Sequence, residues 1–111
     1  MTSTTTTITT NEVLTLINTF TVKPENQQTV IDMLNEATEQ VMRHFPGFIS
    51  AKIHRGVDRT KVANYAQWES MEYYQAMMKE GNAREHMSKV AGMVESFEPL
   101  YYEVDHVCHK N

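Results

Sequence analysis

The chain has 111 residues, of which 41% are hydrophobic and 22% are charged, and its formal net charge at pH 7 is −4. A chain of this length forms one domain with a single core, and its composition is that of ordinary soluble proteins. The lack of a basic cluster argues against nucleic acid or an anionic membrane surface as a partner, and no apolar run approaches the roughly 20 residues of a membrane span.

The start of the chain and its cysteine content predict a cytoplasmic protein. The first residues lack both the basic start and the apolar stretch of a secretory signal. Cys108 is the only cysteine, so no internal disulfide can form and a reducing compartment is expected.

A Thr-rich segment opens the chain. Residues 2–10 are all Thr or Ser apart from Ile8. Because such a segment buries little apolar area, it predicts a flexible tail over residues 1–11 and a folded domain over residues 12–108. The alternative is an arm that pairs with a partner subunit, since Thr tolerates strand geometry.

The first part of the domain predicts a strand, a helix and a second strand. Val, Leu, Ile, Thr and Phe dominate residues 12–22, as is typical of a strand. Pro24 suits the first turn of a helix that extends to about His44. The apolar stripe of this helix consists of Val30, Met33, Leu34, Ala37 and Val41. Residues 45–47 end the helix, and residues 48–57 form the second strand.

The middle of the domain predicts a hairpin and a short helix. A turn at residues 58–60 leads into a third strand, which should pair with the second as an antiparallel hairpin. Ser70 is a suitable N-cap for the short helix, and Gly81 interrupts that helix. Asn82, with Glu85 three residues later, predicts a capping box that opens another helix.

A fourth strand over residues 96–106 closes the chain, and Pro99 indicates a bulge or an edge position in it. The element order is therefore β-α-β-β-α-β, which is the ferredoxin-like α+β fold with an antiparallel sheet and helices on one face. Ala63 and Tyr65 lie on the other face, so we expect a homodimer in which two sheets pack face to face. A monomer with a solvated sheet face is the alternative.

The third strand carries the candidate site. Alternation places the apolar Val62 and Ala66 on one side together with Asn64 and Trp68. The Asn64 amide and the Trp68 indole lie about 13 Å apart along the strand, which suits the floor of a pocket for a flat, partly polar aromatic ligand. The alternative is that Asn64 is an edge residue and Trp68 a core anchor.

Parts of this sequence resemble the antibiotic biosynthesis monooxygenase family. They are the segment FPGFISA at residues 45–51, Asp58, and the segment VANYAQWES at residues 62–70. The likeness extends from about Val13 to Val107. It implies a small protein that forms a dimeric α+β barrel.

Within that family, residues 64–70 are very similar to the cofactor-free monooxygenases that oxidise aromatic polyketide anthrones with O₂. The resemblance implies that Asn64, Trp68 and Tyr74 line the pocket and carry the chemistry, and that Arg84 binds substrate. A substrate of this kind loses a proton to give an electron-rich anion that can reduce O₂ without flavin or metal. Neutral donors such as Asn64 and Trp68 would stabilise the oxyanion, and Tyr74 would hold a phenolic oxygen or relay a proton. The alternative for Tyr74 is the amphipathic cap of a short helix.

A haem-degrading branch of the same superfamily gives an alternative function. Its motif is matched by Asn18 on the first strand and approximately by His86 on the later helix, which would ligate haem or bind another substrate. Met77 stands where that motif has Trp. A non-catalytic dimeric binding module is the third hypothesis. No metal site is expected, because His106 and His109 would point to opposite faces of a strand, and no nucleotide-binding motif is present.

Overall fold

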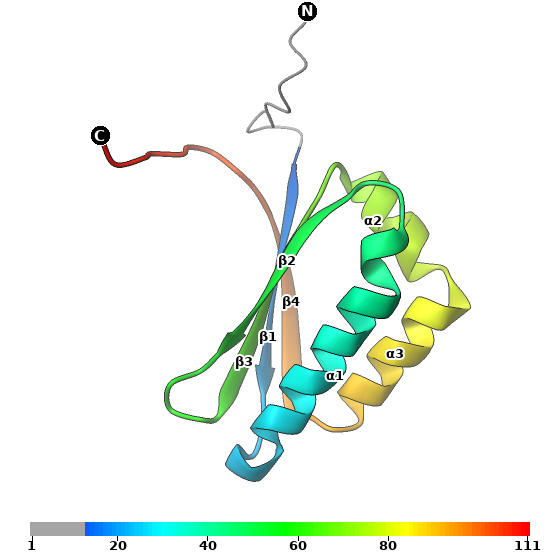
Figure 1. Ribbon diagram of the computed structural model, residues 1–111, viewed down its shortest axis with the longest axis vertical. Coiled ribbons are helices and arrows are strands. Elements are labelled where there is room, and N and C mark those ends of the chain that lie inside the picture. Colours follow the sequence, from blue (N-terminus) through cyan, green and yellow to red (C-terminus); the bar gives the residue numbers. More distant parts are fainter. Residues whose placement is uncertain (1–12) are drawn as a thin grey trace, which may run out of the picture.

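A computed structural model describes residues 13–111, which form a four-stranded antiparallel sheet with helices packed on one face (Figure 1). The strand order is β2-β3-β1-β4. The elements, in chain order, are β1 (Leu14–Thr21), α1 (Gln27–Gln40), β2 (Phe48–Arg55), β3 (Lys61–Trp68), α2 (Met71–Met78), α3 (Gly81–Ala91) and β4 (Ser96–Glu103), with 3₁₀ turns at Pro24–Asn26 and Met42–His44. The predicted ferredoxin-like α+β fold is confirmed. The predicted tail, residues 1–11, lies outside the described residues.

Antiparallel pairing of β1 with β3 fixes which side chains face the helices. The helix-facing pairs are Leu14 with Trp68, Leu16 with Ala66, Asn18 with Asn64, and Phe20 with Val62. Because side chains alternate along each strand, these pairs form one continuous surface under α1 and α3. Every apolar member of the four pairs is buried.

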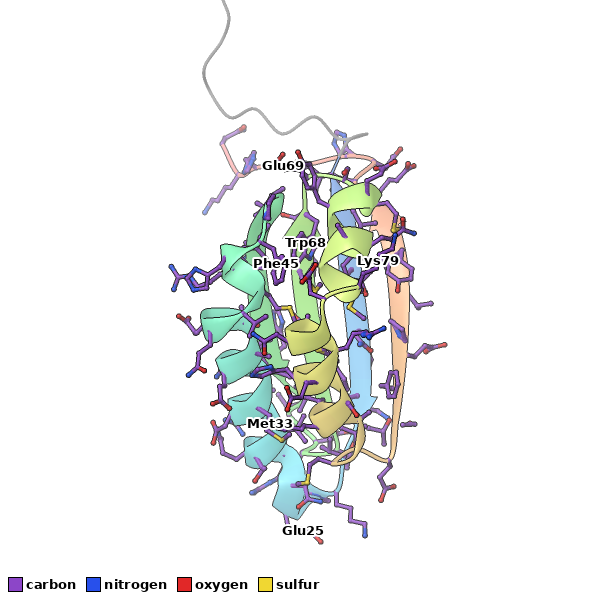
Figure 2. All side chains as sticks on the ribbon, turned by 90° about the vertical axis from the view of Figure 1, so that its right-hand side faces the viewer. Glu25, Met33, Phe45, Trp68, Glu69 and Lys79 are labelled. Carbon is purple, nitrogen blue, oxygen red and sulfur yellow. The ribbon has the colours of Figure 1, made fainter. Side chains whose placement is uncertain are left out.

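The core consists of two clusters between the sheet and the helices. One gathers around Trp68 and Tyr74, and the other around Phe20 and Leu34. The predicted α1 stripe is confirmed, because its residues are buried apart from a half-buried Met33. Figure 2 shows Trp68 inside the molecule and the exposed Glu25 at its surface. In residues 13–111, no helix has the length and apolar character needed to cross a membrane.

A buried amide, that of Gln27, ties the β2–β3 hairpin to α1. Its Nε2 donates to the backbone carbonyls of Gly56 and Lys61, each at 3.0 Å. Arg55 Nη1 donates to the Gln27 Oε1 at 3.3 Å. The hairpin end is thereby fixed against the helix, and with it the position of β3, which carries Asn64.

The predicted hairpin turn is formed by local hydrogen bonds. The backbone N–H of Arg59 donates to the Gly56 carbonyl at 3.0 Å, and the N–H of Thr60 donates to the Asp58 carboxylate at 2.9 Å. These bonds let Arg59 adopt a positive φ of 73°. The Thr60 N–H also lowers the pKa of the Asp58 carboxyl, because it stabilises the charged form.

Two boundary predictions were wrong. Asn82 and Glu85 do not form a capping box, because α3 already begins at Gly81, and the Arg84 N–H donates to the Glu80 carbonyl at 3.0 Å. The last strand ends at Glu103 rather than at residue 106, because Glu103 pairs with Leu14, the first residue of β1.

Two other predictions about local structure are confirmed. Pro99 lies on the edge strand β4, opposite Asn18, with no register shift, so the edge alternative holds and the bulge does not. Ser70 caps α2, because its Oγ accepts a hydrogen bond from the Tyr73 N–H at 3.4 Å.

Gly47 positions the start of α2. Its φ is +86°, and its carbonyl accepts a hydrogen bond from the Glu69 N–H at 2.7 Å. A Cβ at this position would lie 2.3 Å from the Cγ of Tyr73, on the first turn of α2. Only glycine therefore fits here, both for its backbone conformation and for the close approach of the helix that carries Tyr74.

We expect Gly47→Ala to lower the free energy of unfolding by at least about 1 kcal/mol, because the new Cβ meets both the left-handed backbone penalty and the Tyr73 ring. Urea denaturation measures the change. Gly81→Ala is the matched control, since no atom lies within 4 Å of its Cβ and alanine favours helix. Equal effects of the two substitutions would contradict this account.

Candidate functional site

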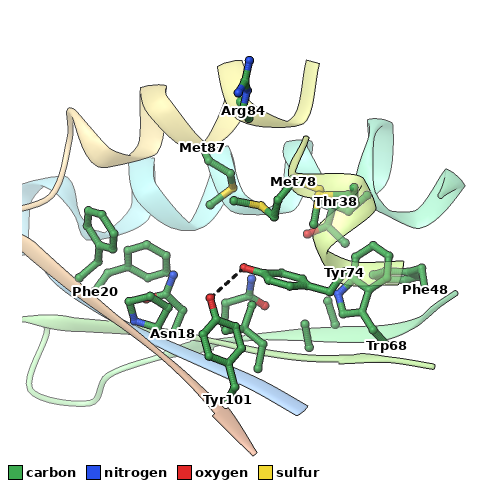
Figure 3. A pocket seen from close by; sticks show the side chains of 18 of the residues that line it. Asn18, Phe20, Thr38, Phe48, Trp68, Tyr74, Met78, Arg84, Met87 and Tyr101 are labelled. Atoms are coloured by element: carbon green, nitrogen blue, oxygen red, sulfur yellow. Dashed lines mark hydrogen bonds between the residues drawn. The ribbon is translucent and has the colours of Figure 1, made fainter. Parts of the chain in front are cut away.

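A cavity of about 340 Å³ lies between the sheet and the helices (Figure 3). Its floor comes from β1, β2, β3 and β4, and its roof from the three helices. The lining residues are Leu16, Asn18, Phe20, Thr38, Met42, Phe48, Ala51, Asn64, Ala66, Trp68, Tyr74, Met77, Met78, Arg84, Met87, Ser88, Ala91, Phe97, Pro99 and Tyr101. Most of these are apolar, so the few polar groups stand out.

Two asparagines form the polar centre of the floor. Asn18 and Asn64 are direct partners across β1 and β3. The Oδ1 atoms of both are buried and have no hydrogen-bond partner among the described residues. An unpartnered buried acceptor is costly and therefore rare in folded proteins. A pair of them in one cavity is typical of a site whose ligand or water supplies the missing donors.

Trp68 closes one end of the cavity. Its side chain is only 2% exposed, and its ring makes edge contacts with Phe48 at 5.3 Å and with Tyr74 at 6.0 Å between centroids. The three rings form a rigid aromatic wall (Figure 3). The indole N–H is the only polar group of Trp68, and it can only donate.

Tyr74 points its hydroxyl into the cavity toward the hydroxyl of Tyr101 on β4, with 3.4 Å between the two oxygens (Figure 3). Burial of Tyr74 raises its pKa above the usual tyrosine value, and the hydrogen bond with Tyr101 raises it further. Tyr74 is therefore a neutral phenol throughout the neutral pH range, able to donate and accept at the same time.

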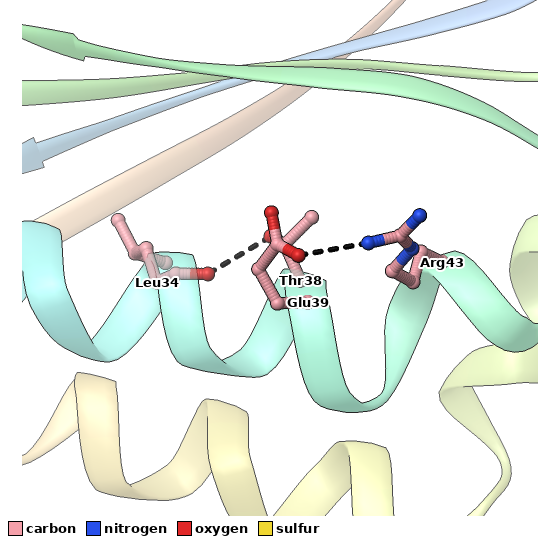
Figure 4. A network of polar contacts seen from close by, with 4 residues as sticks. All are labelled: Leu34, Thr38, Glu39 and Arg43. Atoms are coloured by element: carbon pink, nitrogen blue, oxygen red, sulfur yellow. Dashed lines mark hydrogen bonds and ion pairs between the residues drawn. The ribbon is translucent and has the colours of Figure 1, made fainter.

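The roof of the cavity is rich in methionine sulfur, and its polar residues besides Tyr74 are Thr38, Arg84 and Ser88. Met77, Met78 and Met87 contribute flexible thioethers. Thr38 also lines the roof, but its Oγ1 already donates to the Leu34 carbonyl at 2.9 Å (Figure 4).

Beside Thr38, Glu39 and Arg43 form a 2.8 Å ion pair with side chains that are 69% and 55% exposed (Figure 4). Such a pair contributes little to stability, because solvent screens it. Neither residue of the ion pair lines the cavity, whose polar side chains are Asn18, Asn64, Tyr74, Tyr101, Thr38, Arg84 and Ser88.

The structure brings together most of the predicted site residues. Asn64, Trp68 and Tyr74 line one cavity, and Arg84 lines it as an exposed residue whose side chain points away from the sheet (Figure 3). His86 does not line the cavity, and its Nδ1 makes a 2.9 Å hydrogen bond with the Asn82 carbonyl.

The geometry does not fit the haem alternative. The cavity contains no histidine among the residues 13–111, so the predicted axial ligand, His86, is missing from it. Over the same residues, no group of three or more His, Cys, Asp or Glu side chains is arranged to hold a metal ion.

Tyr101 and Asn18 extend the predicted set. Tyr101 was not predicted as a site residue, although alternation from Phe97 and Pro99 places it on the same face of the last strand. The sequence indicates Asn18 as a site residue only through the haem motif. Its position opposite Asn64 depends on strand register, which the sequence does not give.

Comparison with known proteins identifies the family. Residues 13–89 match the family described as antibiotic biosynthesis monooxygenase. Over 95 residues, the sequence is 38% identical to the tetracenomycin-F1 monooxygenase of Streptomyces glaucescens, covering 86% of this chain and 84% of that protein. The chain belongs to the antibiotic biosynthesis monooxygenase family. The resemblance found in the sequence is thereby confirmed.

Solved structures of a monooxygenase and of an oxygenase have the same fold. The monooxygenase from the ActVA-Orf6 gene of Streptomyces coelicolor, in complex with nanaomycin D, superimposes with a TM-score of 0.82 at 23% identity, over 88% of this chain and 92% of that chain. SnoaB of Streptomyces nogalater, described as a cofactor-independent oxygenase, gives 0.71 at 16% identity, over 89% and 99% of the two chains.

The raised pKa of Tyr74 predicts a specific loss of stability in alkali. Below the ordinary tyrosine pKa of about 10, the phenol is neutral in both the folded and the unfolded chain. Above it, the unfolded chain ionises while the folded Tyr74 stays protonated, so the free energy of unfolding falls as the pH rises. We expect Tyr74→Phe to lose less stability than the wild type between about pH 9 and about pH 11.

Urea denaturation across this pH range measures the effect. Tyr73→Phe, which removes an exposed hydroxyl from the same helix, should lose as much stability in alkali as the wild type. A Tyr74→Phe variant that loses as much stability as the wild type would refute the assignment.

Proposed function

We propose that this member of the family is a cofactor-independent monooxygenase that oxidises an aromatic, anthrone-like polyketide with O₂. The observation that carries the proposal is an apolar cavity in which two unpartnered amide oxygens lie in the same lining as Trp68 and Tyr74. The names of the relatives support it, since they include a tetracenomycin-F1 monooxygenase and a cofactor-independent oxygenase.

The cavity suits a flat aromatic ligand. Its volume of about 340 Å³ lies within the range of pockets that bind drug-sized molecules. Trp68, Phe48 and Tyr74 offer ring faces and edges at one end, and Phe20 and Phe97, with centroids 6.3 Å apart, line the other. The methionine roof adapts to ring systems of different outline.

The proposed reaction begins with loss of a proton from the acidic carbon between the rings. The resulting anion is delocalised and passes one electron to O₂, and the two radicals combine at that carbon. One oxygen atom stays as the new carbonyl, and the other leaves as water with two hydrogens from the substrate. The substrate is oxidised by the same O₂ that is reduced, so the balance requires no further reductant.

The residues have distinct parts in this reaction. The amides of Asn18 and Asn64 hold the substrate oxygens, and the Asn64 amide and the Trp68 N–H stabilise the negative charge as it develops. Tyr74, neutral at working pH, transfers the proton. Arg84, exposed at the edge of the cavity, binds an acidic group of the substrate. His86 has no part in this proposal.

Oxygen uptake by metal-free protein supplied with a dihydroxyanthracenone tests the function. We expect turnover by the wild type, and a fall of more than tenfold in kcat for Asn64→Ala, which corresponds to about 1.4 kcal/mol of lost transition-state stabilisation. Gln67→Ala removes an amide from the opposite face of the same strand, where Gln67 bonds to Thr15, and should keep wild-type turnover.

Binding can be followed separately, because Trp68 is the only tryptophan of the chain. Quenching of its emission by the quinone product gives a dissociation constant for each variant. Quenching without oxygen uptake would contradict the enzymatic proposal and favour a non-catalytic binding module.

We further propose that the chain forms a homodimer and that it works in the cytoplasm. The sheet face away from the helices carries an apolar row in which Ile17 pairs with Tyr65 on one side and with Leu100 on the other. Leu100 is 44% exposed, and no helix in residues 13–111 covers this face. Packing two such faces together would bury the row around a two-fold axis.

Light scattering after gel filtration tests the dimer. We expect the wild type at twice the chain mass of 12.8 kDa, and Leu100→Glu at the mass of one chain or with a dimer dissociation constant raised more than tenfold, because a carboxylate would be buried in an apolar interface. Val57→Glu is the control, since Val57 lies in the hairpin loop and is 100% exposed. A monomeric wild type would overturn the proposal.

A further inference from the structure

Tyr101 stands between two cavities. It lines the substrate cavity described above, and it also lines a second hollow of about 500 Å³ beside the start of α2. Among the described residues, Tyr101 is the one that lines both of these cavities. The second hollow carries the exposed carboxylates of Glu72 and Glu103.

Of the two tyrosines, Tyr74 is buried and Tyr101 reaches the solvent. Tyr74 is 8% exposed, and its hydroxyl lies inside the substrate cavity, 3.4 Å from the Tyr101 hydroxyl. Tyr101 is 46% exposed, so its ring is in contact with solvent. The two rings meet edge to face at 5.6 Å between centroids, an arrangement that holds both hydroxyls in place.

We propose that Tyr101 is the proton outlet of the site, the group through which the proton lost by the substrate leaves the cavity. Its hydroxyl orients the Tyr74 hydroxyl and passes the proton on to the second hollow. Tyr101 is thus a positioning residue that acts through Tyr74. The inference rests on the proposed function, because it assumes a substrate with an acidic carbon.

The transfer is balanced by a shift of three protons. The C–H bond of the substrate breaks, and its electron pair stays on the substrate as the delocalised anion. The proton from the substrate bonds to the Tyr74 oxygen while the hydroxyl proton of Tyr74 moves to the Tyr101 oxygen. The hydroxyl proton of Tyr101 moves to water or to a carboxylate in the second hollow. Both phenols end neutral, as the buried position of Tyr74 requires, because burial opposes a phenolate there.

The test separates proton removal from oxidation. Under anaerobic conditions in D₂O, proton NMR follows the exchange of the acidic C–H of a dihydroxyanthracenone for deuterium. We expect the wild type to accelerate this exchange and Tyr101→Phe to slow it at least tenfold. The dissociation constant of the quinone, from Trp68 emission, should change less than twofold in Tyr101→Phe. Tyr73→Phe, which alters a neighbouring phenol outside both cavities, should exchange at the wild-type rate.

The outcomes test the role of Tyr101 separately from the proposed oxygenase activity. Slow exchange in Tyr101→Phe with normal binding supports the outlet, even if the wild type takes up no oxygen, in which case the proposed function fails alone. If Tyr101→Phe exchanges the C–H at the wild-type rate, the outlet is overturned, and the oxygenase proposal is then judged by oxygen uptake alone. The outlet is also overturned if weaker binding of the quinone accounts for the whole fall in exchange rate, or if the wild type does not accelerate the exchange.

Discussion

The antiparallel register between β1 and β3 is the constraint on which the site depends. Asn18 and Asn64 meet in the cavity because they are direct partners in that register. A slip of one residue would turn every side chain of the strand to the opposite face and remove the amides from the cavity. The register is secured by burial of Phe20 and Val62 at one end and of Trp68 at the other. The same packing that stabilises the fold therefore assembles the site.

The roof and the floor of the cavity differ in their polar groups. Its roof offers methionine sulfur atoms, the Tyr74 hydroxyl, and the side chains of Thr38, Arg84 and Ser88. The Thr38 hydroxyl hydrogen is already donated to the helix. Its floor offers two amide oxygens without hydrogen-bond partners in the described part of the chain. Each lowers the stability of the folded state, and a ligand that donates a hydrogen bond to it would restore that stability. Under the proposed function, the substrate would lie with its oxygens toward the sheet and its rings under the helices. Among residues 13–111, Arg84, at the edge of the cavity, is the one charged residue in its lining.

Predictions based on local pattern were the most accurate. The α1 stripe, the Ser70 cap and the edge position of Pro99 each follow from residue type and spacing within one element, and the structure has all three. The Asn82 capping box was wrong because an N-cap also depends on the preceding backbone, which here turns helical at Gly81. The end of the last strand was wrong because the length of a strand is limited by its neighbour, β1.

The sequence by itself determined the α+β element order, and it placed Asn64 and Trp68 on one face of a strand, because alternation is a property of the extended backbone. Family resemblance added Tyr74. Only the tertiary structure decided that Asn18 lies opposite Asn64, that His86 stays outside the cavity, and that Tyr101 meets Tyr74 from 27 residues away. These are contacts between segments distant in the chain, and they are set by strand register and helix packing rather than by the pattern of any one segment.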